Sequence, residues 1–201
     1  AGSGLDVVVN PGGVLYFAAN DGALGGELWR SDGTAAGTWL VADISPGSSG
    51  SNPTRMVGVN GLFVFSAHTP ATGWEMWSSD GTAAGTRLLA DLMPGPTDSS
   101  PFPYAVGNGV LYFGAATPAT GYEIFQTDGT PAGTRLFADI GPGPAPGYIG
   151  DPAFLGGILY FGADDGTYGR ELWQTDGTTA GTRRVRDIRL GAAGSAVSGF
   201  F

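Results

Sequence analysis

The chain has 201 residues, a formal net charge of −9 at pH 7 and no cysteine, and all nine basic residues are arginine. This acidic balance excludes the basic surface that binds nucleic acids or anionic membranes, and the missing cysteine excludes disulfides, thiolate nucleophiles and cysteine-bound metals. No apolar run approaches the roughly 20 residues that a membrane-spanning helix needs, so we expect no membrane insertion. The 37 glycines and 14 prolines would indicate disorder in a polar chain, but 42% of the residues are hydrophobic, enough to bury a core.

One unit is repeated four times along the chain. An Asp-Gly-Thr tripeptide recurs every 48 residues, preceded by a glutamate and followed by a Gly-Thr pair and a further aspartate. The tripeptides begin at Asp32, Asp80, Asp128 and Asp176. An uninterrupted period of this length is typical of propeller blades.

In chain order, we predict blades at residues 5–47, 53–95, 101–143 and 149–191, within one domain over residues 1–201. Residues 7–9 would form the first inner strand, and residues 192–201 the start of a further inner strand. In the second copy, the strands are expected at 55–59, 62–67, 74–78 and 86–92. Asn60-Gly61 indicates a type I′ hairpin, because that turn needs a positive φ at both central residues. A long connection over residues 93–101 would lead into the third copy.

The strands carry consecutive apolar residues, as in Leu111-Tyr112-Phe113, which favours sheets covered on both faces. We therefore predict an all-β fold, a β-propeller with four 48-residue, four-stranded antiparallel blades. Because the last nine residues are in phase with the first nine, an alternative is half of a larger propeller completed by a second chain. Such a chain would be a homo-oligomer or would self-associate.

Glycine occupies five slots in every copy. In the first copy these are Gly13, Gly25, Gly33, Gly37 and Gly47. We expect all five slots at turns that require a positive φ.

The run Glu-Leu-Trp-x-x-Asp-Gly-Thr at residues 27–34 and 171–178 resembles the ELWxxDGT repeat of bacterial proteins. The second copy has Met76 for leucine, and the third has Ile124 and Phe125 for leucine and tryptophan. The resemblance covers essentially the whole chain and implies a large, secreted or cell-surface protein with no settled activity. The tripeptide turn also resembles the Asp-box of sialidase-type propellers, in which the aspartate stabilises a hairpin.

Most acidic residues occupy repeated positions, which favours structural roles, because an active site needs a unique constellation. For Asp32, Asp80, Asp128 and Asp176, the alternatives are an Asx-type turn or a Ca²⁺ ligand. For Glu27, Glu75, Glu123 and Glu171, the alternatives are a partner for backbone or arginine or a cation-binding ring. Asp43 and its copies are expected to cap the long connection.

The loop before the repeated glutamate differs among the copies, as expected of a ligand-facing rim or of tolerated drift. We name Trp74, Tyr122, Tyr168 and Arg170 as candidate ligand-binding residues, the aromatic ones because they could stack on sugars. The tryptophan slot that begins with Trp29 is expected to pack between blades. His68 is expected to be an ordinary surface histidine, and the Asp164-Asp165 pair is the weakest candidate for acid–base chemistry.

These patterns favour a non-catalytic structural or binding module of a bacterial extracellular or cell-surface protein, which displays rim loops to a glycan or protein. A lectin-like propeller is the second possibility. A glycoside hydrolase is the third, because it needs two positioned carboxylates. No residue is nominated as catalytic.

Overall fold

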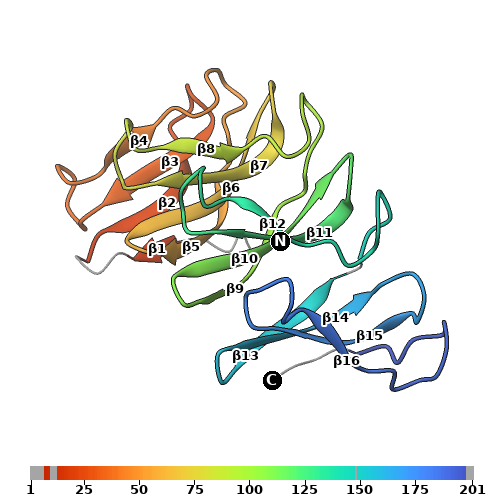
Figure 1. The fold of residues 1–201 in the computed structure, drawn as a ribbon. Helices are drawn as coiled ribbons and strands as arrows, with labels where there is room; N and C mark the ends of the chain where they lie inside the picture. The colour runs from red at the N-terminus through yellow and green to blue at the C-terminus, as the bar shows by residue number, and fades with distance from the viewer. Residues whose placement is uncertain (1–6, 10–12, 148, 198–201) are drawn as a thin grey trace. The chain divides into compact units, whose positions relative to one another are not determined.

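The computed structural model describes residues 7–9, 13–147 and 149–197 (Figure 1). Their regular structure consists of four four-stranded antiparallel sheets, each a meander whose strands neighbour one another in chain order. None of the described residues is helical, and none therefore belongs to a helix that could cross a membrane. The all-β prediction of four antiparallel four-stranded sheets is confirmed.

The sheets are numbered here in chain order. Sheet 1 has β1 (Val7–Val9), β2 (Leu15–Asn20), β3 (Gly26–Ser31) and β4 (Trp39–Ala42). Sheet 2 has β5 (Thr54–Val59), β6 (Leu62–Thr69), β7 (Gly73–Ser79) and β8 (Arg87–Ala90). Sheet 3 has β9 (Phe102–Gly107), β10 (Val110–Thr117), β11 (Gly121–Thr127) and β12 (Arg135–Ala138). Sheet 4 has β13 (Gly150–Leu155), β14 (Ile158–Asp164), β15 (Arg170–Thr175) and β16 (Arg183–Arg186).

The chain divides into two compact units. Residues 1–101 with 129–131 form the first, which holds sheets 1 and 2, and residues 102–128 with 132–201 form the second, which holds sheets 3 and 4. Residues 192–197 contain no strand, and the predicted strand start at residues 199–201 lies outside the described residues.

The pairing register of the second and third strands is the same in all four sheets. An alanine faces the repeated glutamate in each case: Ala19 pairs with Glu27, and Ala67 pairs with Glu75. The same pairing joins Ala115 to Glu123 and Ala163 to Glu171. A bulge interrupts the pairing of the third and fourth strands two residues later, as between Leu28 and Trp29. The small alanine leaves space beside the glutamate, and the bulge places the extra residue, such as Val41, on the fourth strand and bends that strand locally.

The hairpin turns confirm most of the glycine prediction. Asn60 and Gly61 have φ values of 50° and 80°, as a type I′ turn requires. The slots of Gly13, Gly25, Gly33 and Gly47 have positive φ in every copy. The prediction was wrong for the slot of Gly37, whose φ is not positive in any copy. That slot needs glycine for another reason, because a Cβ on Gly37 would overlap the carboxylate of Asp32.

Within each unit, the two sheets pack face to face. In sheets 1 and 3, we call the face that packs on the next sheet the front face, and the opposite one the back face. In sheets 2 and 4, the same names are given to the faces that carry the equivalent repeat positions. In the first unit, the front face of sheet 1 contributes Tyr16, Leu28 and Val41, and the back face of sheet 2 contributes Phe63, Phe65 and Ala67.

The second unit repeats this arrangement. Tyr112, Ile124 and Phe137 lie on the front face of sheet 3, and Leu159, Phe161 and Ala163 lie on the back face of sheet 4. Trp77 and Trp173 pack against the two cores, which confirms the packing expected of the tryptophan slot in these two copies.

Candidate functional site: the loop edge of each sheet

At one edge of each sheet, the short loop between the second and third strands lies against the long connection that follows the fourth strand. We call this region the loop edge. In sheet 2, a Cβ on Gly73 of the short loop would lie 2.7 Å from the carbonyl carbon of Thr97 in the connection. Gly121 approaches Pro144 equally closely in sheet 3, and Gly169 approaches Ala192 in sheet 4. Glycine is required in this slot because two backbones meet there.

Hydrogen bonds join the two segments at the same level in every copy. The carbonyl at the start of the third strand accepts a bond from the connection 25 or 26 residues later in the chain. The bonds are Asn52 N to Gly26 O (2.8 Å), Ser99 N to Trp74 O (3.1 Å), Gly147 N to Tyr122 O (3.1 Å) and Ser195 N to Arg170 O (2.9 Å). These carbonyls belong to a slot that holds a different residue in each copy.

The repeated glutamate anchors the connection from beneath. Glu27 is completely buried, and its carboxylate accepts hydrogen bonds from the backbone N–H groups of Ile44 (3.0 Å), Ser45 (3.2 Å) and Ser51 (2.8 Å). The hydroxyl of Ser51 donates to it as well. One carboxylate therefore satisfies several buried donors of a connection that has no strand partner of its own.

The other copies preserve this clamp. Glu75 accepts bonds from Met93 N (3.1 Å) and Ser99 Oγ (2.6 Å). Glu123 accepts bonds from Ile140 N and Gly141 N, both at 2.9 Å. Glu171 accepts bonds from Ile188 N (3.1 Å), Arg189 N (3.3 Å) and Ser195 Oγ (2.7 Å). Of the interpretations drawn from the sequence, the backbone partner describes all four glutamates.

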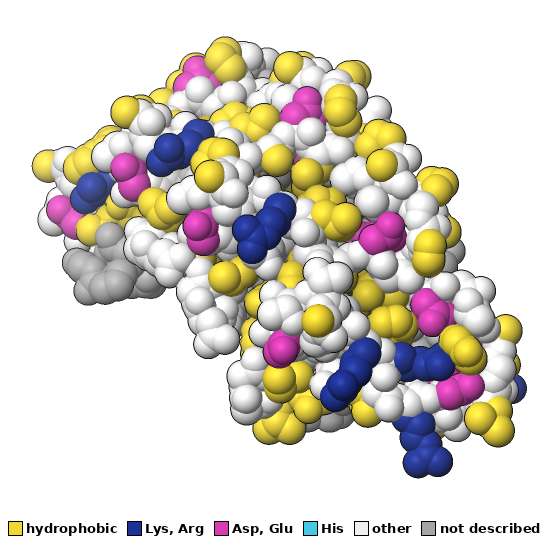
Figure 2. Space-filling model, in the orientation of Figure 1, with side chains coloured by type: hydrophobic (Ala, Val, Ile, Leu, Met, Phe, Trp, Pro, Cys, Tyr) yellow, Lys and Arg dark blue, Asp and Glu magenta, His cyan; other side chains and the backbone are white. Residues whose placement is uncertain are grey.

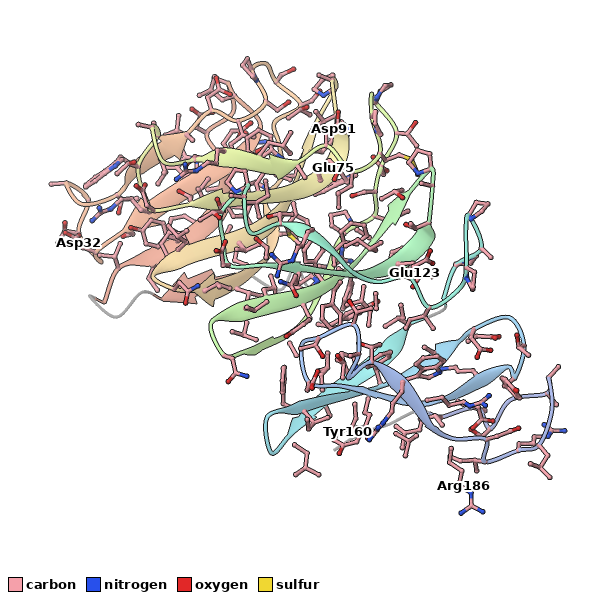
Figure 3. All side chains as sticks on the ribbon, in the orientation of Figure 1. Asp32, Glu75, Asp91, Glu123, Tyr160 and Arg186 are labelled. Carbon is pink, nitrogen blue, oxygen red and sulfur yellow. The ribbon has the colours of Figure 1, made fainter. Side chains whose placement is uncertain are left out.

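The clamp glutamates differ in pKa. Burial raises the pKa of Glu75 and of Glu123 to about 7, against the hydrogen bonds that favour their charged forms. Burial also acts to raise the pKa of Glu171, but hydrogen bonds from Ser195, Ile188 and Arg189 together lower it below its ordinary value. Figure 3 shows Glu75 and Asp91 side by side at one end of sheet 2, where the negative charge of Asp91 adds to the upward shift.

The clamp serine was not identified from the sequence. Ser51, Ser99 and Ser195 each stand 24 residues after the glutamate they bind, and Gly147 holds that slot in sheet 3. This constant spacing was a signal in the sequence. The predicted cap on the connection is confirmed in two copies, because Asp91 and Asp187 accept bonds from Gly95 N and Gly191 N, both at 3.4 Å.

The four candidate metal ligands lie in the turn between the third and fourth strands, where Figure 3 shows Asp32. Asp32 Oδ1 accepts bonds from Thr34 N (2.9 Å) and Thr34 Oγ1 (2.7 Å), and Asp80 and Asp176 bind the threonines two residues later in the same way. The hydroxyl bond from Thr34 is the main cause of the lowered pKa of Asp32. Within the described part of the chain, no three His, Cys, Asp or Glu side chains form a group that could hold a metal ion.

In the first unit, Trp74 is the candidate at the loop edge, and His68 lies beside it. Both are half-buried, and their ring centroids lie 5.8 Å apart, with the rings tilted by 57°. Trp74 N donates to Asp98 Oδ1 (2.8 Å), and His68 N donates to Ser51 O (2.9 Å) of the preceding connection. The backbone of both residues is therefore fixed on the connections, while part of each ring remains accessible.

In the second unit, the side chains of Tyr122 and Arg170 fold back over their own sheets. A Cβ on Gly114 would meet the hydroxyls of Tyr104 and Tyr122, and a Cβ on Gly162 would meet the guanidinium of Arg170. Burial raises the pKa of Tyr104, whose hydroxyl donates to Ile149 O (3.2 Å). Both candidates thus cover small residues of the second strand, and both remain half-buried.

Tyr168 is the most accessible of the candidates, with 37% of its surface exposed, and the Arg184 guanidinium carbon lies 3.4 Å from its ring centroid. Asp165, in the same loop, accepts bonds from Thr167 N (2.9 Å) and Tyr168 N (3.0 Å). Asp164 accepts a bond from Gly166 N (2.8 Å). The acidic pair therefore shapes the loop that presents Tyr168.

No protein-family model and no curated protein matches the chain. Several solved structures are similar to it. A computationally designed protein, Ika8, is 17% identical with a TM-score of 0.46, over 90% of this chain and 48% of that chain. A provisionally assigned TolB from Agrobacterium tumefaciens is 15% identical with a TM-score of 0.46, over 90% of this chain and 61% of that one.

A thermostable family-43 glycoside hydrolase is 12% identical with a TM-score of 0.40, over 88% of this chain and 70% of that one. The chain thus spans about half the length of the designed protein and less than two thirds of the TolB. These identities and TM-scores are too low for the activities named for these proteins to be assigned to this chain.

Proposed function

We propose that this chain is a non-catalytic, propeller-type module of a bacterial extracellular or cell-surface protein, and that its loop edges display variable side chains to a glycan or protein. One observation carries the proposal. The same buried glutamate clamp holds the loop edge in all four copies, while the residue directly before the glutamate is Gly26, Trp74, Tyr122 or Arg170. A binding surface needs a rigid backbone that carries side chains of different types, and the clamp glutamates and the residues before them have this arrangement.

The repeated carboxylates favour a structural over a catalytic assignment. The clamp glutamates bind backbone groups of their own repeats, and Asp32, Asp80 and Asp176 bind the turns that contain them. Membership of the ELWxxDGT-repeat proteins and the extracellular location belong to this proposal. So does a propeller, either closed by the four sheets of one chain or completed by a second chain.

A lectin-like role is the second candidate, and the exposed ring of Tyr168 favours it. Aromatic faces bind the apolar faces of sugars, and the contact with Arg184 holds the Tyr168 ring in place. Trp74 offers a second partly accessible ring, beside His68.

Glycan-array screening of the 201-residue chain, with Ca²⁺ and with a chelator, tests both candidates. We expect Tyr168→Ala and Trp74→Ala to reduce binding to any glycan that is retained. Trp39→Ala is the matched control, because Trp39 is 44% exposed and lies on β4, outside the loop edge. Binding that all three variants leave unchanged would contradict the loop-edge assignment, and loss of binding on chelation would favour Ca²⁺ at the Asp-Gly-Thr turns. Release of reducing sugars by the purified chain would overturn the non-catalytic assignment.

A further inference from the structure

Two sheet faces that are buried elsewhere in the chain are exposed at its first and last sheets. The front face of sheet 4 carries Leu155, Tyr160, Leu172, Val185 and Ile188, one 48-residue period after the front face of sheet 3. Leu155, Val185 and Ile188 are 72%, 45% and 55% exposed. Tyr160 and Leu172 are half-buried.

The same positions are covered in the preceding sheets. Val185 corresponds to Val41, Leu89 and Phe137, which are 5%, 3% and 7% exposed. Leu172 corresponds to Leu28, Met76 and Ile124, of which none is more than 1% exposed. The front face of sheet 4 therefore has the apolar pattern of an interface, and no described strand follows sheet 4 in the chain to cover it.

The back face of sheet 1 is its counterpart. Leu15, at 36% exposure, corresponds to Phe63 and Leu159, which are 4% and 1% exposed and lie in the two cores. Phe17 and Ala19 are half-buried, while the equivalent residues in sheets 2, 3 and 4 are completely buried.

A specific contact accompanies the front-to-back packing within each unit. The hydroxyl of Tyr16 on β2 lies against Gly81 in the Asp-Gly-Thr turn of sheet 2. In the second unit, the hydroxyl of Tyr112 lies 3.1 Å from the position of a Cβ on Gly177 in the turn of sheet 4. Tyr160 holds this slot in sheet 4, as Tyr16 and Tyr112 do in sheets 1 and 3, whereas sheet 2 has Val64 there. Gly33, the turn glycine of sheet 1, has nothing within 4 Å of its Cβ position.

We propose that the chain self-associates head to tail, with the front face of sheet 4 in one copy binding the back face of sheet 1 in a second copy. A second copy is the expected partner, because the same front-to-back contact already joins successive repeats within both units. Tyr160 of one copy would then lie against Gly33 of the second copy. This inference does not rest on ligand binding, so its failure would leave the proposed display role untouched.

Arginine side chains would lie at the edge of this proposed interface. Figure 2 shows arginine side chains gathered over sheet 4, and Figure 3 shows Arg186 projecting away from it. Arg186 stands where the other copies have Ala42, Ala90 and Ala138. A long arginine can extend past an apolar contact and keep its charge in water.

Light scattering coupled to size exclusion, on the 201-residue chain at about 1–100 μM, measures the association. We expect a mass above the 20.4 kDa of one chain, rising with concentration. Val185→Arg on the front face and Leu15→Asp on the back face should each raise the dissociation constant at least tenfold, about 1.4 kcal/mol or more. Leu136→Asp is the matched control, because Leu136 is 37% exposed and lies on neither terminal face. Circular dichroism checks that the variants fold.

Mixing the two variants tests the polarity of the contact. Val185→Arg retains an intact back face and Leu15→Asp an intact front face, so the mixture should form a mixed dimer although each variant alone stays monomeric. A wild-type chain that is monomeric at 100 μM would overturn the proposal. So would an association that Val185→Arg abolishes and Leu15→Asp leaves intact, because that pattern indicates two front faces in contact.

Discussion

The hydroxyl of Ser99 donates a 2.6 Å hydrogen bond to the buried carboxylate of Glu75, across 24 residues of chain. This bond joins the third strand of sheet 2 to the end of the connection that leads into sheet 3. Both residues are completely buried. A strand residue thereby fixes where the next repeat begins, which explains how a connection rich in glycine and proline keeps a constant path.

The clamp hydroxyl should contribute measurably to stability. Ser99→Ala removes the donor and leaves a buried carboxylate with one partner fewer, so we expect a loss of about 1–3 kcal/mol in the free energy of unfolding. Urea denaturation measures the loss. Ser48→Ala, at an exposed position in a connection, is the control and should change stability by less than about 0.5 kcal/mol. Equal stability of Ser99→Ala and wild type would show that the carboxylate does not need the hydroxyl.

Glu75 should make stability depend on pH in the opposite sense to an ordinary surface carboxylate. Its folded pKa is raised to about 7 from 4.5, so the folded state holds a proton that the unfolded state releases between these values. Its contribution to stability is therefore present below pH 4.5 and declines, by roughly 1–3 kcal/mol, as pH rises to 7. Denaturation at pH 5 and pH 8 should show a smaller decline for Glu75→Gln than for wild type.

Glu171 provides the matched comparison for that experiment. Its pKa is lowered, so its contribution is complete above its unfolded pKa and is lost as pH falls below about 4.5. The stability difference between wild type and Glu171→Gln should be flat from pH 5 to 8 and should shrink at more acidic pH. Parallel pH profiles for the two glutamine variants would contradict the assigned shifts.

The slot of Gly37 should reject a methyl group for a reason that a second substitution can relieve. A Cβ there would overlap the Asp32 carboxylate, so Gly37→Ala should lower the free energy of unfolding by about 1–3 kcal/mol. Asp32→Ala in the same chain removes the obstruction, and the double variant should be less destabilised than the sum of the single ones. Gly58→Ala is the control, because Gly58 has no positive φ and nothing within 4 Å of its Cβ position. Additive single effects would rule out the steric explanation.

The sequence predicted the sheets well because the signals for them are local. Asn60-Gly61 sets its own turn, and the 48-residue period repeats each hairpin in phase. The role of Gly37 was mistaken because a glycine looks the same in a sequence whether it supplies a positive φ or only space. The clamp could be only half predicted. The serine 24 residues after Glu75 left a signal in the sequence, but the backbone N–H of Met93, 18 residues after Glu75, belongs to a connection whose path no side-chain pattern records.

The candidate ligand residues show a different limit. Trp74, Tyr122 and Arg170 occupy one slot, but the residue of the neighbouring strand at this level is not the same. Gly114 and Gly162 leave space for the side chains of Tyr122 and Arg170, whereas Ser66 holds that position in sheet 2 and donates to Pro101 O at 3.1 Å. The direction of each side chain therefore depends on the neighbouring strand, which variation at the slot itself does not reveal.

The tryptophan slot offers a test of what the cores require. Trp77 packs against the core of the first unit, and its buried Nε1 has no hydrogen-bond partner among the described residues. Phe125 fills the same slot in sheet 3 and is 3% exposed. Trp77→Phe removes the unsatisfied N–H as well as some volume, so the two effects oppose each other and stability should change by less than about 1.5 kcal/mol.

Trp77→Ala keeps neither the aromatic contact nor the volume and should cost about 3–5 kcal/mol, measured by the same urea denaturation. Trp39→Phe, at an exposed site on β4, is the control for the loss of an indole from the surface and should be nearly neutral. A Trp77→Phe variant as unstable as Trp77→Ala would mean that the indole N–H does find a partner, because loss of ring volume alone cannot make a phenylalanine as costly as an alanine.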